Sequence, residues 1–287
     1  MRILVVGSRG MLGGALLAAG AVAGHDMVGR DVESIDITDA AGTHDVVAAD
    51  APQVVVNCAA YTDVDGAEEH EATALAVNGT GAGNLAGACA AAGARVIHLS
   101  TDYVFPGDGT EPYLESDATG PRSAYGRTKL AGELAVADAA PDHAIVRTAW
   151  LYGAGGKNFV QTMLDLGAQR DVVRVVDDQR GCPTWTGHLV SALLALAASP
   201  ATGIFHAAGG GSCTWFDLAR EALAAVGSPC RVEPTTTDEF PRPAPRPAFS
   251  VLATARGADA VHLPPWQDGL SGFLAARDAT TTTPIGG

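Results

Sequence analysis

Arg2-Ile3-Leu4-Val5-Val6-Gly7-Ser8-Arg9-Gly10-Met11-Leu12-Gly13 opens the chain and decides its fold class. A short β-type run leads directly into three glycines spaced Gly-x-x-Gly-x-x-Gly, and an Ala-rich helical stretch follows. This order is typical of a dinucleotide-binding turn, because the glycines allow close approach of a pyrophosphate to backbone N–H groups. The sequence therefore predicts nucleotide binding by the loop that contains Gly7, Gly10 and Gly13.

Short β-type runs alternate with Ala-rich helical stretches through the first half of the chain. The pattern predicts strands at 2–6, 26–29, 53–57, 95–100 and 144–148, and helices at 11–20, 39–49, 71–92 and 123–139. Alternation at this pitch indicates right-handed βαβ units. We therefore predict an α/β fold with a Rossmann-type, doubly wound parallel sheet that binds its ligand at the carboxyl ends of the strands.

The pattern loosens after about residue 150. Helices are predicted near 156–168, 186–198 and 214–226, and the Pro-rich run 241–247 can be neither helix nor central strand. We predict an NAD(P)-binding domain over 1–149 and a smaller α/β lobe, mainly substrate-binding, over 150–277. Later segments of this lobe return to the sheet of the first domain, and a disordered tail spans 278–287.

Composition and charge exclude several classes of protein. The net charge of −14 argues against nucleic-acid binding, and an anionic substrate would need a local cationic site. The apolar stretch 189–198 is too short to cross a bilayer, and residues 2–7 form a strand and a turn instead of a signal peptide. Five cysteines without a Cys-x-x-Cys pair favour a reduced cytoplasmic protein over a disulfide framework or a zinc site.

Tyr125 and Lys129 are the main catalytic candidates, in a chain that has only two lysines. At i and i+4 of a helix the two side chains share one face. There the ammonium lowers the pKa of the phenol and helps it exchange a proton with a carbonyl or alcohol. Thr101 ends the preceding predicted strand region, and its hydroxyl gains a catalytic interpretation only beside these two residues.

The cofactor subtype is predicted from the end of the second strand. A carboxylate there favours NAD, whereas an arginine pairs with the 2′-phosphate of NADP, and Arg30-Asp31 offers both. Arg9 adds a second cation in the glycine loop, so we predict NADPH, with NADH as the alternative. Asp36 and Ile37 begin a loop on the adenine side.

Three blocks of sequence together resemble a known family. They are Asn-Cys-Ala-Ala-Tyr-Thr-Asp-Val-Asp (57–65), Leu-Ser-Thr-Asp-Tyr-Val-Phe (99–105) and Tyr-Gly-Arg-Thr-Lys-Leu-Ala-Gly-Glu (125–133). With the glycine loop, they resemble the extended short-chain dehydrogenase/reductases and, more narrowly, the dTDP-4-dehydrorhamnose reductases. Further matches lie at 147–152, 178–184 and 246–252, and the resemblance covers the chain to about residue 275.

The resemblance implies NADPH-dependent reduction of the C4 ketone of a dTDP-4-dehydro-6-deoxy sugar, most specifically dTDP-4-dehydro-L-rhamnose. Tyr125 would donate the proton, Lys129 would hold the nicotinamide ribose, and Thr101 would contact the substrate carbonyl. The implied cofactor contacts are Gly10, Met11, Leu12, Asp36, Ile37, Ala60, Tyr61, Thr62 and Leu99. The implied substrate contacts are Thr101, Asp102, Tyr103, Trp150 and Arg246, whose guanidinium suits a diphosphate.

Other interpretations stay open at this point. The substrate can be another dTDP-deoxysugar of natural-product biosynthesis, or the chain can be a non-catalytic regulatory subunit resembling the partner of methionine adenosyltransferase. The presence of Thr101, Tyr125 and Lys129 argues against a purely scaffolding role, because such a role does not need these three residues. A nucleotide-sugar 4,6-dehydratase is disfavoured, because Tyr103 stands where that chemistry needs a carboxylate after Thr101-Asp102.

One departure from the family concerns metal. Some members build an intersubunit magnesium site from glutamates, and the corresponding positions here are Ala15 and His188. We therefore predict no metal site and no metal-bridged dimer, while the oligomeric state is left open.

Overall fold

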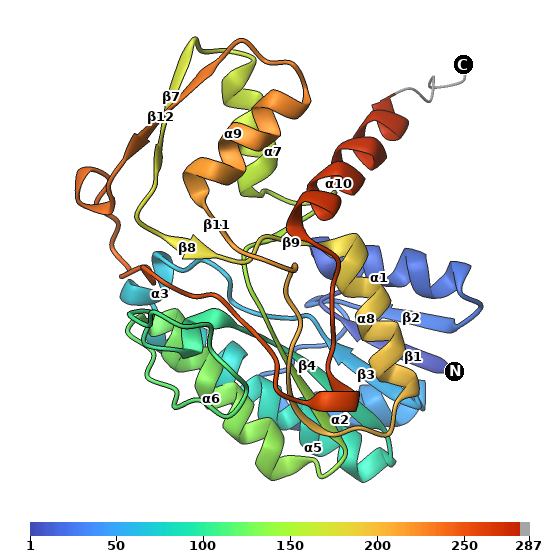
Figure 1. Ribbon diagram of the computed structural model, residues 1–287. Helices are drawn as coiled ribbons and strands as arrows, with labels where there is room; N and C mark the ends of the chain where they lie inside the picture. The colour runs from blue at the N-terminus through green and yellow to red at the C-terminus, as the bar shows by residue number, and fades with distance from the viewer. Residues whose placement is uncertain (282–287) are drawn as a thin grey trace.

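A parallel six-stranded sheet forms the centre of the computed structural model, which describes residues 1–281 and the side chains of 1–277 (Figure 1). The strand order is β10-β5-β4-β3-β1-β2, and every neighbouring pair is parallel. The strands are β1 (Arg2–Val6), β2 (Asp26–Arg30), β3 (Val54–Asn57), β4 (Arg95–Thr101), β5 (His143–Thr148) and β10 (Gly203–His206). The predicted fold class is confirmed, and the order reverses between β1 and β3, where such sheets bind ligands.

Helical layers cover both faces of this sheet (Figure 1). Ile3 and Val5 pack with α1 (Met11–Val22) and α8 (Thr186–Ala198). Leu4 and Val6 point to the opposite layer, formed by α2 (Ala40–Asp50), α5 (Ala82–Ala92) and α6 (Ala124–Ala139). Burial on both faces explains why the central strands β1 and β3 are almost continuous apolar runs rather than alternating ones.

The predicted helix 71–92 is interrupted. It consists of α4 (Glu71–Leu75), a π-helical turn η1 (Ala76–Gly81) and α5. The carbonyl oxygen of Asn78 lies so close to Gly132 of α6 that a Cβ at Gly132 would collide with it. Such turns are rare and often lie near functional sites. Here the Asn78 side chain bonds both backbone groups of Tyr61 and the hydroxyl of Thr128, so it is a satisfied buried amide.

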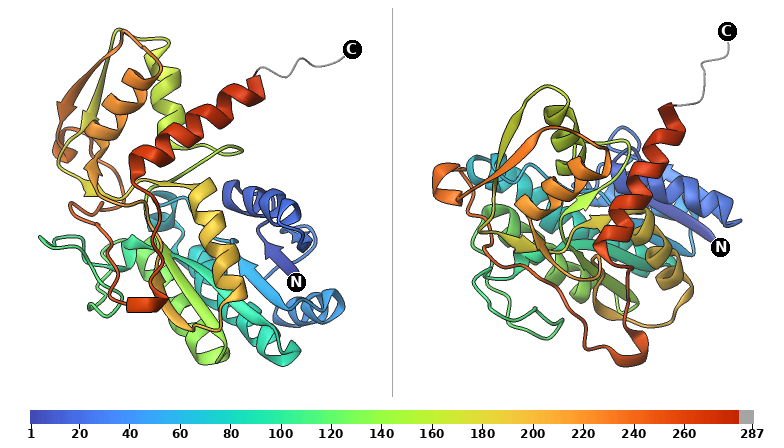
Figure 2. Two further views of the ribbon diagram at one scale, coloured as in Figure 1. Left: turned by 45° about the vertical axis from the view of Figure 1, so that its right-hand side comes forward. Right: turned by 45° about the horizontal axis from the view of Figure 1, so that its top comes forward.

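The second half of the chain forms a smaller lobe, except for α8 and β10, which belong to the sheet and its helical layer (Figure 2). In the lobe, α7 (Phe159–Gly167), α9 (Trp215–Ala225) and α10 (Trp266–Thr281) pack with the parallel pair β7 (Val172–Val176) and β12 (Arg231–Thr235). Short pairs join β6 (Leu151–Tyr152) to β9 (Thr184–Trp185) and β8 (Arg180–Gly181) to β11 (Cys213–Thr214). Short helices lie at α3 (Gly66–Glu69), η2 (Asp102–Val104), η3 (Thr237–Glu239) and η4 (Gly257–Asp259).

Two details near the C-terminus differ from prediction. The sequence analysis did not predict α10, and this helix continues to Thr281, beyond the predicted start of a disordered tail at 278. The rest of that predicted tail, 282–287, lies outside the described residues. The Pro-rich run 241–247 is neither helix nor strand, as predicted. Within residues 1–281, no helix is both long and apolar enough to cross a bilayer.

Candidate active site

A cavity of about 920 Å³ lies at the carboxyl ends of the strands, and most of the predicted site residues line it. They are Gly7, Gly10, Met11, Leu12, Gly13, Asp36, Ile37, Ala60, Tyr61, Thr62, Leu99, Thr101, Asp102, Tyr103, Tyr125, Lys129 and Trp150. The exceptions are three arginines, Arg9, Arg30 and Arg246. The sheet edge therefore gathers segments that are far apart in the sequence into one pocket.

The glycine loop has the shape of a pyrophosphate cradle. Gly7 adopts φ +77°, and a Cβ there would lie 2.6 Å from the backbone nitrogen of Ala59. A Cβ at Gly13 would collide with the carbonyl oxygen of Gly7. The first turn of α1 has neither a side-chain cap nor an acidic residue, so its N–H groups are available to an anion. This site fits a dinucleotide.

The arginines predicted to read the cofactor are bound to carboxylates of the protein. Arg30 donates from Nε and Nη2 to Asp50 at 2.9 and 2.7 Å and is not part of the cavity lining, so its contact with the cofactor stays a prediction. The Arg9 side chain pairs with Glu33, and its backbone nitrogen donates to Asp31 at 2.8 Å. At the end of β2, it is the carboxylate Asp31 that lines the cavity.

Three side chains converge at the ends of β4 and α6. Ser123 caps the start of α6 by accepting from Gly126 N at 3.1 Å, and this places Tyr125 and Lys129 on one face. Lys129 Nζ donates to the carbonyl oxygen of Leu99 at 2.6 Å. Tyr125 shares a hydrogen bond with Thr101, whose hydroxyl in turn donates to Asp102 Oδ1 at 2.9 Å. The predicted catalytic triplet is thus assembled.

Burial dominates the electrostatics of this group. It lowers the pKa of Lys129 to about 8, against the raising effect of the Glu133 charge. Burial and the Asp102 charge raise the pKa of Tyr125 to about 12, although the Thr101 hydrogen bond acts in the opposite direction. Burial also raises the pKa of Asp102 to about 6, against hydrogen bonds from Ser250 and Thr101. Tyr125 is therefore a protonated phenol at neutral pH, and the lowering of its pKa by Lys129 stays a prediction.

A buried ion pair beneath the site was missed by the sequence analysis. Arg147 of β5 donates from Nε and Nη2 to the two carboxylate oxygens of Glu133 at 2.9 and 2.7 Å, and both side chains are at most 3% exposed. Ser100 donates to the same carboxylate. This network ties α6 to β4 and β5, so it fixes Tyr125 and Lys129 relative to Thr101. The motif blocks contain all three residues, but their spacing does not show that they meet.

Aromatic rings form the other end of the cavity. Tyr103 contacts the Tyr125 ring edge-on, with centroids 5.5 Å apart. Trp150 stacks on Trp215 at 3.5 Å and adopts φ +47°, in the left-handed region. Trp215, which the sequence analysis did not single out, therefore covers one face of the indole predicted to stack on the substrate. Both tryptophans line the cavity.

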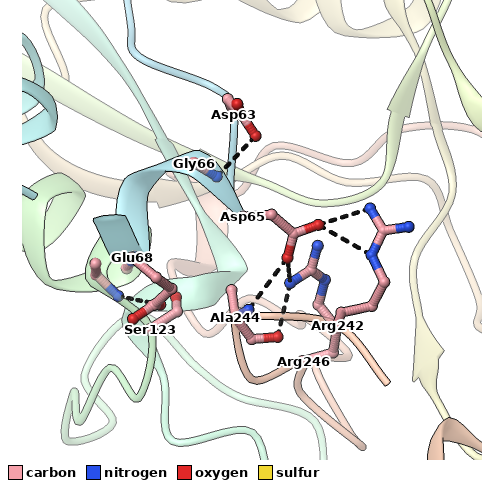
Figure 3. A network of polar contacts seen from close by, with 10 residues as sticks. Asp63, Asp65, Gly66, Glu68, Ser123, Arg242, Ala244 and Arg246 are labelled. Atoms are coloured by element: carbon pink, nitrogen blue, oxygen red, sulfur yellow. Dashed lines mark hydrogen bonds and ion pairs between the residues drawn. The ribbon is translucent and has the colours of Figure 1, made fainter. Parts of the chain in front are cut away.

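Arg246, the predicted diphosphate partner, lies outside the cavity lining. Its Nη1 donates to Asp65 Oδ1 at 2.8 Å (Figure 3). Arg242 binds the other oxygen of the same carboxylate, donating from Nε at 2.9 Å. The contact of Arg246 with substrate stays a prediction.

Ala15 and His188 stand at the positions that hold magnesium-binding glutamates in some family members, and their surroundings differ. Ala15 packs against the core between α1 and α8, while the His188 ring meets Trp185 edge-on at 5.0 Å. No cluster of three or more His, Cys, Asp or Glu suited to a metal occurs within the described residues. We expect purified protein to contain no stoichiometric magnesium, as measured by elemental analysis alongside its oligomeric state. Magnesium held at a subunit interface would contradict this prediction.

Comparison with known proteins gives the family. The family model described as "RmlD substrate binding domain" matches residues 1–278. A dTDP-4-dehydrorhamnose reductase of Streptomyces griseus is 51% identical over 262 residues, which cover 89% of this chain and 86% of that protein. The chain belongs to the dTDP-4-dehydrorhamnose reductase family. The residues that carry this family's motifs are the ones gathered around the cavity.

Two further relatives agree with this family assignment. A dTDP-4-dehydrorhamnose reductase of Mycobacterium tuberculosis is 47% identical over 98% of this chain and 95% of its own length. The crystal structure of the Bacillus anthracis reductase, solved in complex with NADP, superposes with a TM-score of 0.93 at 36% identity, covering 96% of this chain and 99% of that one. The family fold is therefore preserved across nearly the whole chain.

Proposed function

We propose that this protein is an NADPH-dependent reductase that converts dTDP-4-dehydro-L-rhamnose to dTDP-L-rhamnose. The observation that carries the proposal is the convergence of Tyr125, Lys129 and Thr101 at a cavity that begins in a glycine cradle. The names of the relatives supply the substrate, and NADP in the Bacillus anthracis structure supports the cofactor.

The residues of the chain account for the protonation half of such a reduction. When bound, the nicotinamide cofactor supplies the hydride that C4 accepts. Tyr125 Oη then gives its proton to the C4 oxygen, and its raised pKa keeps it protonated until that charge develops. The Thr101 hydroxyl would turn from Asp102 Oδ1 to donate to the same oxygen and orient it. Lys129, held by the Leu99 carbonyl, would bind the ribose of the cofactor with its remaining N–H groups.

We assign substrate binding mainly to the lobe 150–277, since Trp150 and Trp215 contribute to the cavity wall. The proposed partner is the dTDP-4-keto sugar, with no nucleic acid, because the net charge of −14 opposes a polyanion. We also propose a cytoplasmic location, where NADPH and nucleotide sugars are available.

The test is a coupled assay. We expect NADPH oxidation at 340 nm with dTDP-4-dehydro-6-deoxyglucose plus a 3,5-epimerase, and NMR should identify dTDP-L-rhamnose as the product. NADPH binding without turnover of this substrate would contradict the proposed substrate. Turnover without the epimerase, or a product of different configuration at C4, would point to another dTDP-deoxysugar.

The pKa of Lys129 predicts the pH dependence of cofactor binding. Because this pKa is about 8, the protonated fraction is high below pH 8 and is lost above it. We expect the Kd of NADPH to rise by up to about tenfold per pH unit above pH 8, as the ammonium loses its charge. Fluorescence titration between pH 6.5 and 9.5 measures this. The Lys129→Met variant should bind weakly and without this pH dependence, and a flat wild-type profile would contradict the prediction.

A further inference from the structure

The segment 242–250 is a proline-rich strap that depends on other parts of the chain for its hydrogen bonds. Prolines at 241, 243, 245 and 247 remove every second N–H donor and restrict φ, so the strap cannot join a sheet by itself. Of the donors that remain, Ala244 N is bound by Asp65 Oδ1 at 3.1 Å. Asp65 lies about 180 positions earlier, directly before α3.

Asp65 is the anchor of this strap, and both of its carboxylate oxygens are used (Figure 3). Oδ2 accepts from Arg242 Nε and Nη2 at 2.9 and 2.6 Å, while Oδ1 accepts from Ala244 N and from Arg246 Nη1 at 2.8 Å. Burial would raise the pKa of Asp65, but the bonds from Arg246, Ala244 and Arg242 outweigh it and lower this pKa to about 2. The anchor is therefore charged at any physiological pH.

The anchored strap lies against residues of the cavity. Pro247 packs so tightly on Gly107 that a Cβ there would lie 2.6 Å from the proline Cβ. Further along the strap, the Ser250 hydroxyl bonds Asp102, which lines the cavity. The positive charge of Arg246 also acts on the phenol of Tyr103, another cavity residue, and opposes the rise in its pKa. Arg246 is therefore outside the cavity lining but within electrostatic reach of Tyr103, and the strap itself contacts the cavity residue Asp102 through Ser250.

The Arg246 side chain keeps free donors in this position. It is 15% exposed, and Nη1 makes its bonds to Asp65 and to the Ala244 carbonyl at 2.7 Å. Among residues 1–277, Nε and Nη2 have no hydrogen-bond partner. A planar guanidinium held by one nitrogen presents its remaining edge in a fixed direction, which is the geometry that binds phosphate oxygens well.

We propose that Asp65 is a positioning residue for nucleotide-sugar binding: it holds Arg246 and the strap so that the free edge of the guanidinium meets the diphosphate. This inference rests on the proposed function, because it takes the ligand to be a dTDP sugar. Two arginines and one carboxylate also leave this site with one net positive charge, the local cation that an anionic ligand needs on a protein of net charge −14.

The test measures the Kd of dTDP by calorimetry and the Kd of NADPH by fluorescence for Asp65→Asn, Arg246→Gln and the double variant. We expect the dTDP Kd to rise about fivefold to fiftyfold in each single variant, since a charge-assisted bond to the diphosphate is lost or misdirected. If Asp65 acts through Arg246, the double variant should match Arg246→Gln instead of showing the product of the two effects. The NADPH Kd should stay within about twofold, which a general loss of structure would not allow.

Asp63→Asn is the matched control. Asp63 lies in the same loop and accepts only from Gly66 N, at 3.0 Å, so its variant should bind dTDP like the wild type. An unchanged or lower dTDP Kd in Asp65→Asn would overturn the inference, the lower value showing that Asp65 merely neutralises the arginines. The inference would also be overturned if the dTDP Kd of the double variant rose by the product of the two single-variant factors. Failure of the wild type to bind dTDP would instead remove the proposed function, and this inference with it.

Discussion

Replacing Tyr125 with phenylalanine should lower kcat by about a hundredfold to ten-thousandfold, the range expected when a general acid is removed. The substitution deletes only the phenol oxygen, so C4 would accept hydride with no proton donor at its oxygen. The ring contact with Tyr103 stays, because Phe keeps the edge-on geometry. NADPH affinity should change by no more than about twofold, since the glycine cradle is untouched.

The assay is steady-state NADPH oxidation, with cofactor binding measured separately by fluorescence. Tyr113→Phe serves as the control, because Tyr113 lies outside the cavity lining and its hydroxyl only accepts from Gly109 N at 3.0 Å. Full activity in Tyr125→Phe would remove this phenol from the mechanism. Equal losses in kcat and in NADPH affinity would mean that the variant had disturbed the cofactor site.

The Glu133→Gln variant should lose about 3–5 kcal/mol of unfolding free energy, because it leaves Arg147 as an unpaired charge in the interior. Arg147 is 2% exposed and binds Glu133 through two nitrogens, so water cannot replace the lost partner. Replacing both residues, as in Glu133→Leu with Arg147→Met, should recover much of that loss, since neither charge of this pair then stays buried without its partner.

Urea unfolding at neutral pH measures both variants. Glu71→Gln is a matched control, because Glu71 also binds an arginine bidentately but both side chains are 43% exposed. Exposed pairs contribute about 0–1 kcal/mol, so this control should stay close to the wild type. If Glu133→Gln were no less stable than Glu71→Gln, the pair would not hold α6 against β4 and β5.

Much of the fold was predictable because its signals are local. The apolar run 2–6 followed by Gly7, Gly10 and Gly13 places a strand, a tight turn and a helix next to one another, and neighbours in the chain are neighbours in space. The predicted helices and strands begin and end close to their predicted limits for the same reason, except for 71–92, where close approach of Gly132 accompanies the π-turn. The strand β10 and the helix α10 were not predicted.

The meeting of Thr101, Tyr125 and Lys129 at one cavity was predictable from two local patterns and one rule of topology. The i, i+4 spacing puts Tyr125 and Lys129 on one face of α6, and Thr101 ends a neighbouring parallel strand. Because parallel strands end at the same sheet edge, the two patterns had to meet. The family resemblance added the substrate, which these patterns alone do not contain.

The βαβ alternation, the glycine cradle and the shared helix face of Tyr125 and Lys129 could all be predicted from the sequence, since each depends on residues within a few positions of one another. Only the tertiary structure decided which carboxylate each arginine binds: Arg30 binds Asp50, Arg147 binds Glu133, and Arg246 binds Asp65. A guanidinium is long and pairs with any carboxylate in reach. Which one is in reach depends on the packing of strands, helices and the strap, and therefore on contacts between residues far apart in the chain.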